Sequence, residues 1–467
     1  MKINSILGIL DKKTQSKLRR YLNSEYFCTD PQLPRLYDIL LKDLKQDEET
    51  IKRNAWNELF GKQAYADVKM RLLMSRLVTQ IENFIGIEYK EDTPFNLSHL
   101  RLYRHKSEDK LFLQILEEQK KFQEKSPLRN ETYYERSYSL GLEEYDFLVN
   151  KKRQGDFNLR QISDSIEISY AIKKLRHCCR VLQIHSIYKL ETLFPYIEET
   201  LRYIETNEWF NLPVLGFYYY NYQSIINPLD VHYFNRCFEL YELSEEKFEE
   251  EERRYAFIDI LNYCIRKLNE GSDKYYDIIF NLYNRGLNQG FLIDQGKLSR
   301  FTFRNIAEIG IQIKEYQWVL DFLDKYKIFV EKKYRDSFYQ LEKARVLSDQ
   351  RNYDKANSLL ANLSFSDPMI ELSTRLERIR IFYETDEIDL CHYHVESMDL
   401  FLRRKKNIGY HTAYYKNFLS YVRKLVRPEL SEYKYWKTLR QQLDNEDKIT
   451  SRKWLIEKLE NKMSNKR

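Results

Sequence analysis

Glycine and proline are scarce in this chain, whose 467 residues include only 12 glycines and 9 prolines. Both shares lie well below the roughly 7% and 5% that are usual in globular proteins. Sheet-rich folds need glycine at tight hairpin turns and in phosphate-binding loops. The scarcity therefore predicts an all-α fold whose helices are joined by short polar turns. With 43% hydrophobic and 32% charged residues, the chain can form both a core and solvated helix faces.

Breaks between the apolar segments divide the chain into four parts. Residues 1–90 are predicted to form a small helical N-terminal domain. Residues 96–300 alternate long amphipathic segments with turn residues, which predicts degenerate helical hairpins. Residues 300–405 carry a clearer repeat, and residues 406–467 are predicted to form a basic C-terminal helical cap.

Two segments test this helical interpretation. In the N-terminal domain Gly61 is expected to end one helix, and residues 67–85 are expected to form the next. One face of that second helix carries Leu73, Leu77, Ile81 and Phe84. The run from Gly216 to Tyr222 has the highest strand propensity in the chain. Its surroundings predict a buried helix instead.

A repeat is clearest over residues 337–370. Ala344, Ala356 and Pro368 follow one another at intervals of 12 residues, and Tyr353 lies just before the second alanine. This pattern resembles the tetratricopeptide repeat (TPR), a helix-turn-helix of about 34 residues. The resemblance implies that the alanines allow two helices to cross closely, that the tyrosine lies at the turn, and that the proline closes the unit. It implies a TPR-like solenoid of antiparallel helix hairpins.

Weaker copies of the repeat flank this unit. Upstream, Ala307 and Tyr316 stand at the corresponding positions, with Tyr316 and Tyr353 separated by 37 residues. Downstream, a third copy around residues 385–390 lies 34 residues after Ala356 but lacks the alanines. We therefore expect at least three successive helix pairs in this part of the chain.

The N-terminal domain shows a second resemblance, carried by residues 50–86. A segment with Trp56 before Gly61 precedes a helix that contains Arg71-Leu-Leu-Met-Ser-Arg76-Leu. This is similar to the winged helix of bacterial transcriptional activators that also contain TPR domains. The resemblance implies DNA contacts from Lys69, Arg71 and Arg76. The sequence departs from that pattern after Ile87, where no β-hairpin wing is visible, and the alternative is a helical cap on the solenoid.

The C-terminal part is strongly basic. Residues 401–467 contain 18 Lys and Arg against 7 Asp and Glu, and the run from Arg403 to Lys406 is entirely basic. Trp436 and Trp454 lie among these cations, a composition that can bind single-stranded nucleic acid by charge and stacking. The alternative is the polar terminal cap that a solenoid needs for solubility.

No pattern of catalytic or cofactor-binding residues is present. The chain contains no GxGxxG, GxxxxGK[ST], HExxH or GxSxG motif. His392 and His394, next to Cys391, are two residues apart and therefore point to different sides of a helix. His177, Cys178 and Cys179 with His185, and the acidic run of residues 245–252, are interpreted as helix faces, the latter as a solvated one. We expect no catalytic, cofactor or metal site.

The six cysteines form no CxxC pair, and no apolar run reaches the length of a signal-peptide core or a membrane span. These features predict a protein of the reducing cytoplasm with no membrane partner. The 38 tyrosines either fill gaps between helices or line a peptide groove. We expect a non-enzymatic scaffold that binds a protein or peptide on the concave face of the solenoid. The alternative is a DNA-binding transcriptional regulator with a TPR-like sensor or partner domain.

Overall fold

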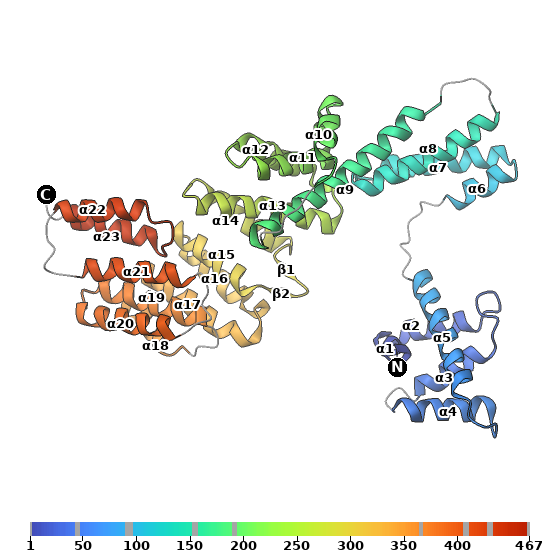
Figure 1. The fold of residues 1–467 in the computed structure, drawn as a ribbon, viewed down its shortest axis with the longest axis horizontal. Helices are drawn as coiled ribbons and strands as arrows, with labels where there is room; N and C mark the ends of the chain where they lie inside the picture. The colour runs from blue at the N-terminus through green and yellow to red at the C-terminus, as the bar shows by residue number, and fades with distance from the viewer. Residues whose placement is uncertain are drawn as a thin grey trace. The chain divides into compact units, whose positions relative to one another are not determined.

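The structure is a computed structural model, and it describes residues 2–42, 47–88, 97–151, 157–188, 194–363, 368–404, 411–426 and 433–464. These residues form 23 α-helices and only two very short strands, so the expected all-α fold is confirmed (Figure 1). Across these ranges no helix is both long and apolar enough to cross a membrane. The chain divides into two compact units, residues 1–125 and 126–467.

The first unit contains seven helices within its described residues. They are α1 (Lys2–Ile9), α2 (Lys12–Leu22), α3 (Gln32–Lys42), α4 (Glu48–Phe60), α5 (Asp67–Glu88), α6 (Ser98–His105) and α7 (Asp109–Lys125). Gly61 ends α4 with a φ of 62°, a left-handed conformation that glycine adopts without strain. The expected face of α5 is buried in the core that α1 to α5 share. This unit continues through α6 and α7, beyond the 1–90 range expected for the N-terminal domain.

The second unit begins with a long hairpin and continues as successive helix pairs. Its first helices are α8 (Glu131–Lys151), α9 (Leu159–Tyr188), α10 (Ile197–Thr206), α11 (Pro213–Ile226), α12 (Val231–Ser244), α13 (Glu250–Asn269) and α14 (Tyr275–Asn288). The following helices are α15 (Arg300–Gln312), α16 (Tyr316–Tyr326), α17 (Lys332–Asp349), α18 (Tyr353–Ala361), α19 (Pro368–Glu384), α20 (Ile388–Arg404), α21 (His411–Leu425), α22 (Tyr433–Asp444) and α23 (Arg452–Ser464).

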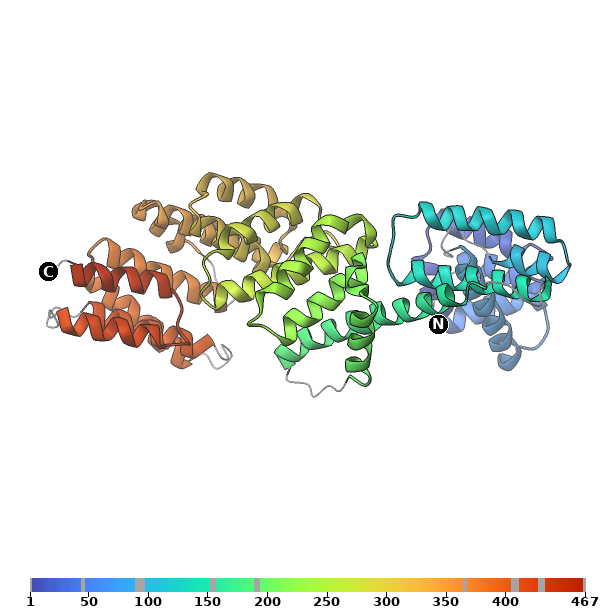
Figure 2. The same cartoon turned by 90° about the horizontal axis from the view of Figure 1, so that it is seen from above.

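Each pair consists of two neighbouring helices that pack along one another, as α13 does with α14 and α17 with α18. The first helices of adjacent pairs also meet, because α15 contacts α17 and α17 contacts α19. Figures 1 and 2 show these pairs following one another from α11 to α20. The second unit is therefore a solenoid-like stack of helix pairs.

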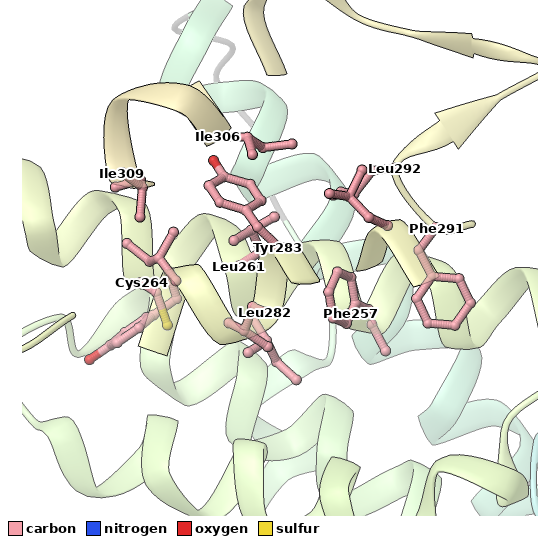
Figure 3. Packing of buried hydrophobic residues seen from close by; sticks show 14 of the residues in the cluster. Phe257, Leu261, Cys264, Leu282, Tyr283, Phe291, Leu292, Ile306 and Ile309 are labelled. Carbon is pink, nitrogen blue, oxygen red and sulfur yellow. The ribbon is translucent and has the colours of Figure 1, made fainter. Parts of the chain in front are cut away.

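Aromatic and aliphatic side chains fill the space between the pairs. Figure 3 shows Tyr283 of α14 surrounded by residues of α13 and α15. They include Leu261, Cys264, Ile306 and Ile309. Tyr283 is fully buried in this cluster, which runs from α9 to α19. The gap-filling role considered for the tyrosines is thus realised at this position.

A second buried cluster continues from α19 to α23, and α19 contributes to both. Its Ile370 and Ile381 belong to the first cluster. Its Leu372, Leu376, Ile379 and Phe382 belong to the second. One helix therefore packs on two neighbouring cores.

One local prediction about strand and helix is confirmed, and one local feature was not predicted. The run from Gly216 to Tyr222 is buried inside α11, as expected. Gly216 allows the close approach of this helix, because an added Cβ would lie 2.2 Å from the carbonyl oxygen of Phe210. A small hairpin was not predicted: β1 (Ile293–Asp294) pairs antiparallel with β2 (Lys297–Leu298). Two-residue strands are too short to show an alternating pattern, although Gly296 marks the turn.

Candidate binding groove

The residues of the clearest repeat lie where α17 and α18 pack together. Ala344 in α17 and Ala356 in α18 are both fully buried. Tyr353 is the first residue of α18, and Pro368 is the first residue of α19. Proline suits that position because the first turn of a helix does not need its backbone N–H.

The preceding pair, α15 and α16, reaches a similar close approach with different residues. Ala307 is fully buried in α15, and Tyr316 begins α16. Val319 of α16 lies so close to Gly310 that an added Cβ would be 2.4 Å from its side chain. Here glycine on the first helix makes room for valine on the second. The Tyr316 hydroxyl also donates to Asp349 Oδ2 at 2.6 Å, which joins α16 to the end of α17.

The third pair, α19 and α20, has a period of 35 residues and not 34. This period follows from the helix starts, since α18 begins at Tyr353 and α20 at Ile388. The residue that corresponds to Ala356 is therefore Cys391, which is fully buried and whose Sγ lies 3.7 Å from the Ile379 carbonyl oxygen. A small residue is present at this crossing, but a search for alanine at a spacing of 34 misses it.

The same period of 35 residues repeats a pair of charged residues on the first helices. Glu342 and Arg345 on α17 correspond to Glu377 and Arg380 on α19. Arg345 donates to Glu342 Oε2 at 2.8 Å and also pairs with Glu308 on α15. Arg380 donates to Glu377 Oε2 at 3.1 Å. A row of glutamates and arginines therefore crosses α15, α17 and α19.

Burial and charge act in opposite directions along this row. Burial tends to raise the pKa of Glu308, but Arg345 overcomes it and lowers that pKa to about 2. Burial raises the pKa of Glu342, because this carboxylate is fully enclosed, and the charges of Arg345 and Arg304 offset that effect only in part. Burial also opposes the charge of Arg345, but Glu308 and Glu342 raise its pKa well above the ordinary value. Arg345 therefore stays charged between two carboxylates.

Four members of this row line a groove of about 600 Å³: Glu308, Arg345, Glu377 and Arg380. Its charged and polar walls include Arg304, Glu308, Gln312, Arg345, Asp349, Ser373, Glu377, Arg380, Arg452 and Lys453. The groove thus collects side chains from three consecutive pairs and from the last helix. We call this surface the α15–α19 groove.

One end of the α15–α19 groove is bounded by a contact between distant parts of the second unit. Lys453 at the start of α23 pairs with Asp273 in the turn before α14, at 2.9 Å. Its ammonium group also lies 4.3 Å from the centre of the Tyr276 ring. These contacts place α23 beside the start of α14, about 180 residues earlier in the chain.

Two polar atoms in the groove are buried without a hydrogen-bond partner among the described residues: Ser373 Oγ and Arg380 Nε. Ser373 is only 6% exposed. A buried polar group without a partner costs free energy. A bound polar segment that supplied these partners would remove this cost.

The three cations predicted to contact DNA each have an intramolecular partner. Lys69 lies over the ring of Phe60, 4.0 Å from its centre. Arg71 pairs with Asp67 on the same helix, and Arg76 lies 3.5 Å from Asp30. The place where a wing would follow α5, residues 89–96, lies outside the described residues. Lys405 and Lys406 of the C-terminal basic run lie outside them as well.

The two tryptophans of the C-terminal basic part are core residues. Trp436 is 3% exposed and Trp454 is 6% exposed. Trp454 also donates its Nε1 proton to Glu384 at 2.6 Å. Stacking of bases on these rings would require the last helices to separate, so the structure favours the terminal-cap interpretation for them.

The acidic run of residues 245–252, which ends in the first turn of α13, is not entirely a solvated face. Glu252 is buried and accepts hydrogen bonds from Arg176 at 2.9 Å and from the Tyr218 hydroxyl at 2.9 Å. Arg176 also pairs with Glu131. Seven of the eight residues from 245 to 252 are acidic or basic, and nothing in their order marks the one that points inward.

Among the side chains that the structure describes, the cysteines and histidines are not gathered into one site. Each of the six cysteines is buried and without a disulfide. In the described part of the chain no group of three or more His, Cys, Asp or Glu side chains is arranged to hold a metal ion. The side chains of His185 and His411 lie outside that description. His394 stacks on Phe382, with the ring centres 4.9 Å apart.

No protein-family model, curated protein or solved structure matches the chain.

Proposed function

We propose that the protein is a non-enzymatic, TPR-like scaffold that binds a protein or peptide segment in the α15–α19 groove. The observation that carries this proposal is the groove itself, which spans three helix pairs and contains the unpartnered Ser373 Oγ and Arg380 Nε. An extended segment fits such a surface because it can reach all three pairs at once. Its acceptor groups would bond to Arg380, and its donors or acceptors to the Ser373 hydroxyl.

The repeat signature supports the same proposal. Ala307, Ala344 and Ala356 are all fully buried within the packed pairs. Tyr316 and Tyr353 begin the second helices of two pairs. We infer that these residues define TPR-like units whose first helices form the binding face. Six unpaired buried cysteines also fit a protein that works in the reducing cytoplasm.

A bulky substitution in the groove tests this function. Gln312 is an exposed groove residue at the end of α15, and Gln317 is an exposed residue of α16 outside the groove. Full-length wild type, Gln312→Trp and Gln317→Trp would each be used to capture partners from a native lysate, with quantitative mass spectrometry. We expect proteins captured by wild type and Gln317→Trp to be lost from Gln312→Trp. Equal capture by all three chains would reject the groove as the binding site.

The DNA-binding alternative is weaker because Lys69, Arg71 and Arg76 already have partners within the first unit. Titration of a fluorescent DNA duplex with the full chain at low salt would decide it. Binding that weakens with salt and is lost in an Arg71→Ala, Arg76→Ala double variant would restore this alternative.

A further inference from the structure

A second pocket lies on α18, α19 and α20, and it uses residues of α19 that do not line the α15–α19 groove. Its volume is about 710 Å³. The residues that matter here are Thr374, Arg375, Arg378, His394 and Ser397. Along α19, Ser373, Glu377 and Arg380 line the groove, whereas Thr374 and Arg378 line this pocket. We call it the α18–α20 pocket.

Arg378 is the most unusual group in the α18–α20 pocket. Its Nε donates to Asn357 Oδ1 at 3.2 Å, but no carboxylate of the described residues lies within ion-pair distance of it. The charged group that most affects it is another guanidinium, Arg375. The pocket wall also includes the carboxylate of Glu387, which accepts a hydrogen bond from Thr385 Oγ1 at 2.9 Å. Burial and Arg375 both lower the pKa of Arg378. A partly buried cation held beside a like charge is unfavourable unless an anion joins it.

Arg375 and Ser397 extend the same donor arrangement. Arg375 uses Nε and Nη2 on Glu371, and its Nη1 donates to Ser397 Oγ at 2.9 Å. Because Ser397 Oγ accepts this bond, its own proton is directed to another acceptor, and none is found among the described residues.

Thr374 supplies an independent observation. It is only 1% exposed, lines the pocket, and its Oγ1 has no hydrogen-bond partner in the part of the chain that the structure describes. His394 completes the wall: burial first, and then the two arginines, lower its pKa to about 4. His394 is therefore neutral near pH 7, so it adds no third positive charge beside Arg375 and Arg378 and offers one ring N–H as a donor.

We propose that the α18–α20 pocket binds a phosphate group, with Arg378 as its principal charged contact. Guanidinium and hydroxyl donors from Arg378, Ser397 and Thr374 meet at one pocket, and a tetrahedral oxyanion offers several acceptor oxygens at once. A single carboxylate would satisfy fewer of them. This site is separate from the scaffold function, and either can fail without the other.

The experiment measures phosphate binding by the full chain. Inorganic phosphate would be titrated into the protein by calorimetry, and melting temperatures would be recorded in phosphate and in chloride at equal ionic strength. O-phosphotyrosine would be titrated in parallel, because binding of both indicates a phosphate ester and binding of inorganic phosphate alone indicates the free ion. Absence of any phosphate-specific binding or stabilisation would overturn the proposal.

Arg378→Gln is the decisive variant, and Arg403→Gln on α20 is its control with the same change in net charge. Arg403 pairs with Asp399 outside the pocket. We expect phosphate affinity to fall at least about tenfold in Arg378→Gln and to stay unchanged in Arg403→Gln. Without phosphate, Arg378→Gln should melt no lower than wild type, because it has no carboxylate to lose. Failure of Arg378→Gln to fold, or unchanged affinity, would contradict the assignment.

Thr374→Val provides a second test, since valine has nearly the same shape but no hydroxyl. We expect weaker phosphate binding with unchanged or higher stability in chloride, because an unpartnered buried hydroxyl is removed. A lower melting temperature in chloride together with unchanged phosphate affinity would assign Thr374 a structural role and count against the site.

Discussion

The α17–α18 and α19–α20 pairs repeat at 35 residues, yet they use different side chains at the same positions. Ala344 and Ala356 of the first pair correspond to Ile379 and Cys391 of the second. Arg345 lies between two carboxylates, whereas among the residues that the structure describes its counterpart Arg380 has one ion pair, with Glu377. The comparison shows that close helix crossing and a buried ion pair are separate requirements. The first pair meets both, whereas in the second pair Arg380 Nε has no hydrogen-bond partner among the described residues.

The largest expected effect is the loss of the Arg345 charge. Arg345→Met leaves Glu308 and Glu342 near one another without their shared cation, and we expect the free energy of unfolding to fall by about 4 kcal/mol. Arg380→Met should cost less, about 3 kcal/mol, because it leaves one buried carboxylate, that of Glu377, without its cation. Urea unfolding measures both values. Equal losses would show that the two arginines have the same structural role.

The next effect concerns the helix crossing of the first pair. Ala356→Trp should lower stability by about 3 kcal/mol or more, because α17 and α18 cannot separate to admit an indole ring. Ala361→Trp is the control, since Ala361 is an exposed residue at the end of the same helix. A melting curve of Ala356→Trp that matches wild type would refute the repeat register.

A pH effect distinguishes the two carboxylates that share Arg345, Glu308 on α15 and Glu342 on α17. The pKa of Glu308 is lowered to about 2 in the folded chain, so its contribution is complete above its unfolded pKa of about 4.5 and is lost as the pH falls toward 2. Because its side chain is 37% exposed, we expect a contribution of about 2 kcal/mol. Glu308→Gln should therefore flatten the decline in stability between pH 5 and pH 2.5, measured by urea unfolding. Glu342→Gln should not flatten it, because the pKa of Glu342 is raised.

The smallest effect is expected at the crossing of the second pair. Cys391→Ala removes one buried sulfur and should cost about 1 kcal/mol. Cys391→Leu should cost more, since Cys391 lies against Ile379. If leucine is accepted without loss in thermal melts, this crossing does not require a small residue.

Local patterns in the sequence predict much of this fold. Gly61 and the apolar face of α5 follow from turn chemistry and helical periodicity. The partners in the groove could not be predicted in the same way, because Glu308 and Arg345 are 37 residues apart and meet only when α15 packs on α17. The fit of Val319 on α16 against Gly310 on α15 likewise depends on two helices and not on one. Periodicity describes one helix at a time, and the site is made by pairs.

The position of α19 in two buried clusters has a consequence for unfolding. Neither cluster can lose this helix and keep its own packing, because each holds part of its side chains. The last helices therefore do not form a cooperative unit that opens independently of the preceding ones. Amide protons of α19 should exchange with solvent as slowly as those of the more protected of the two clusters. A substitution at either end of the second unit should change the exchange rate of this helix.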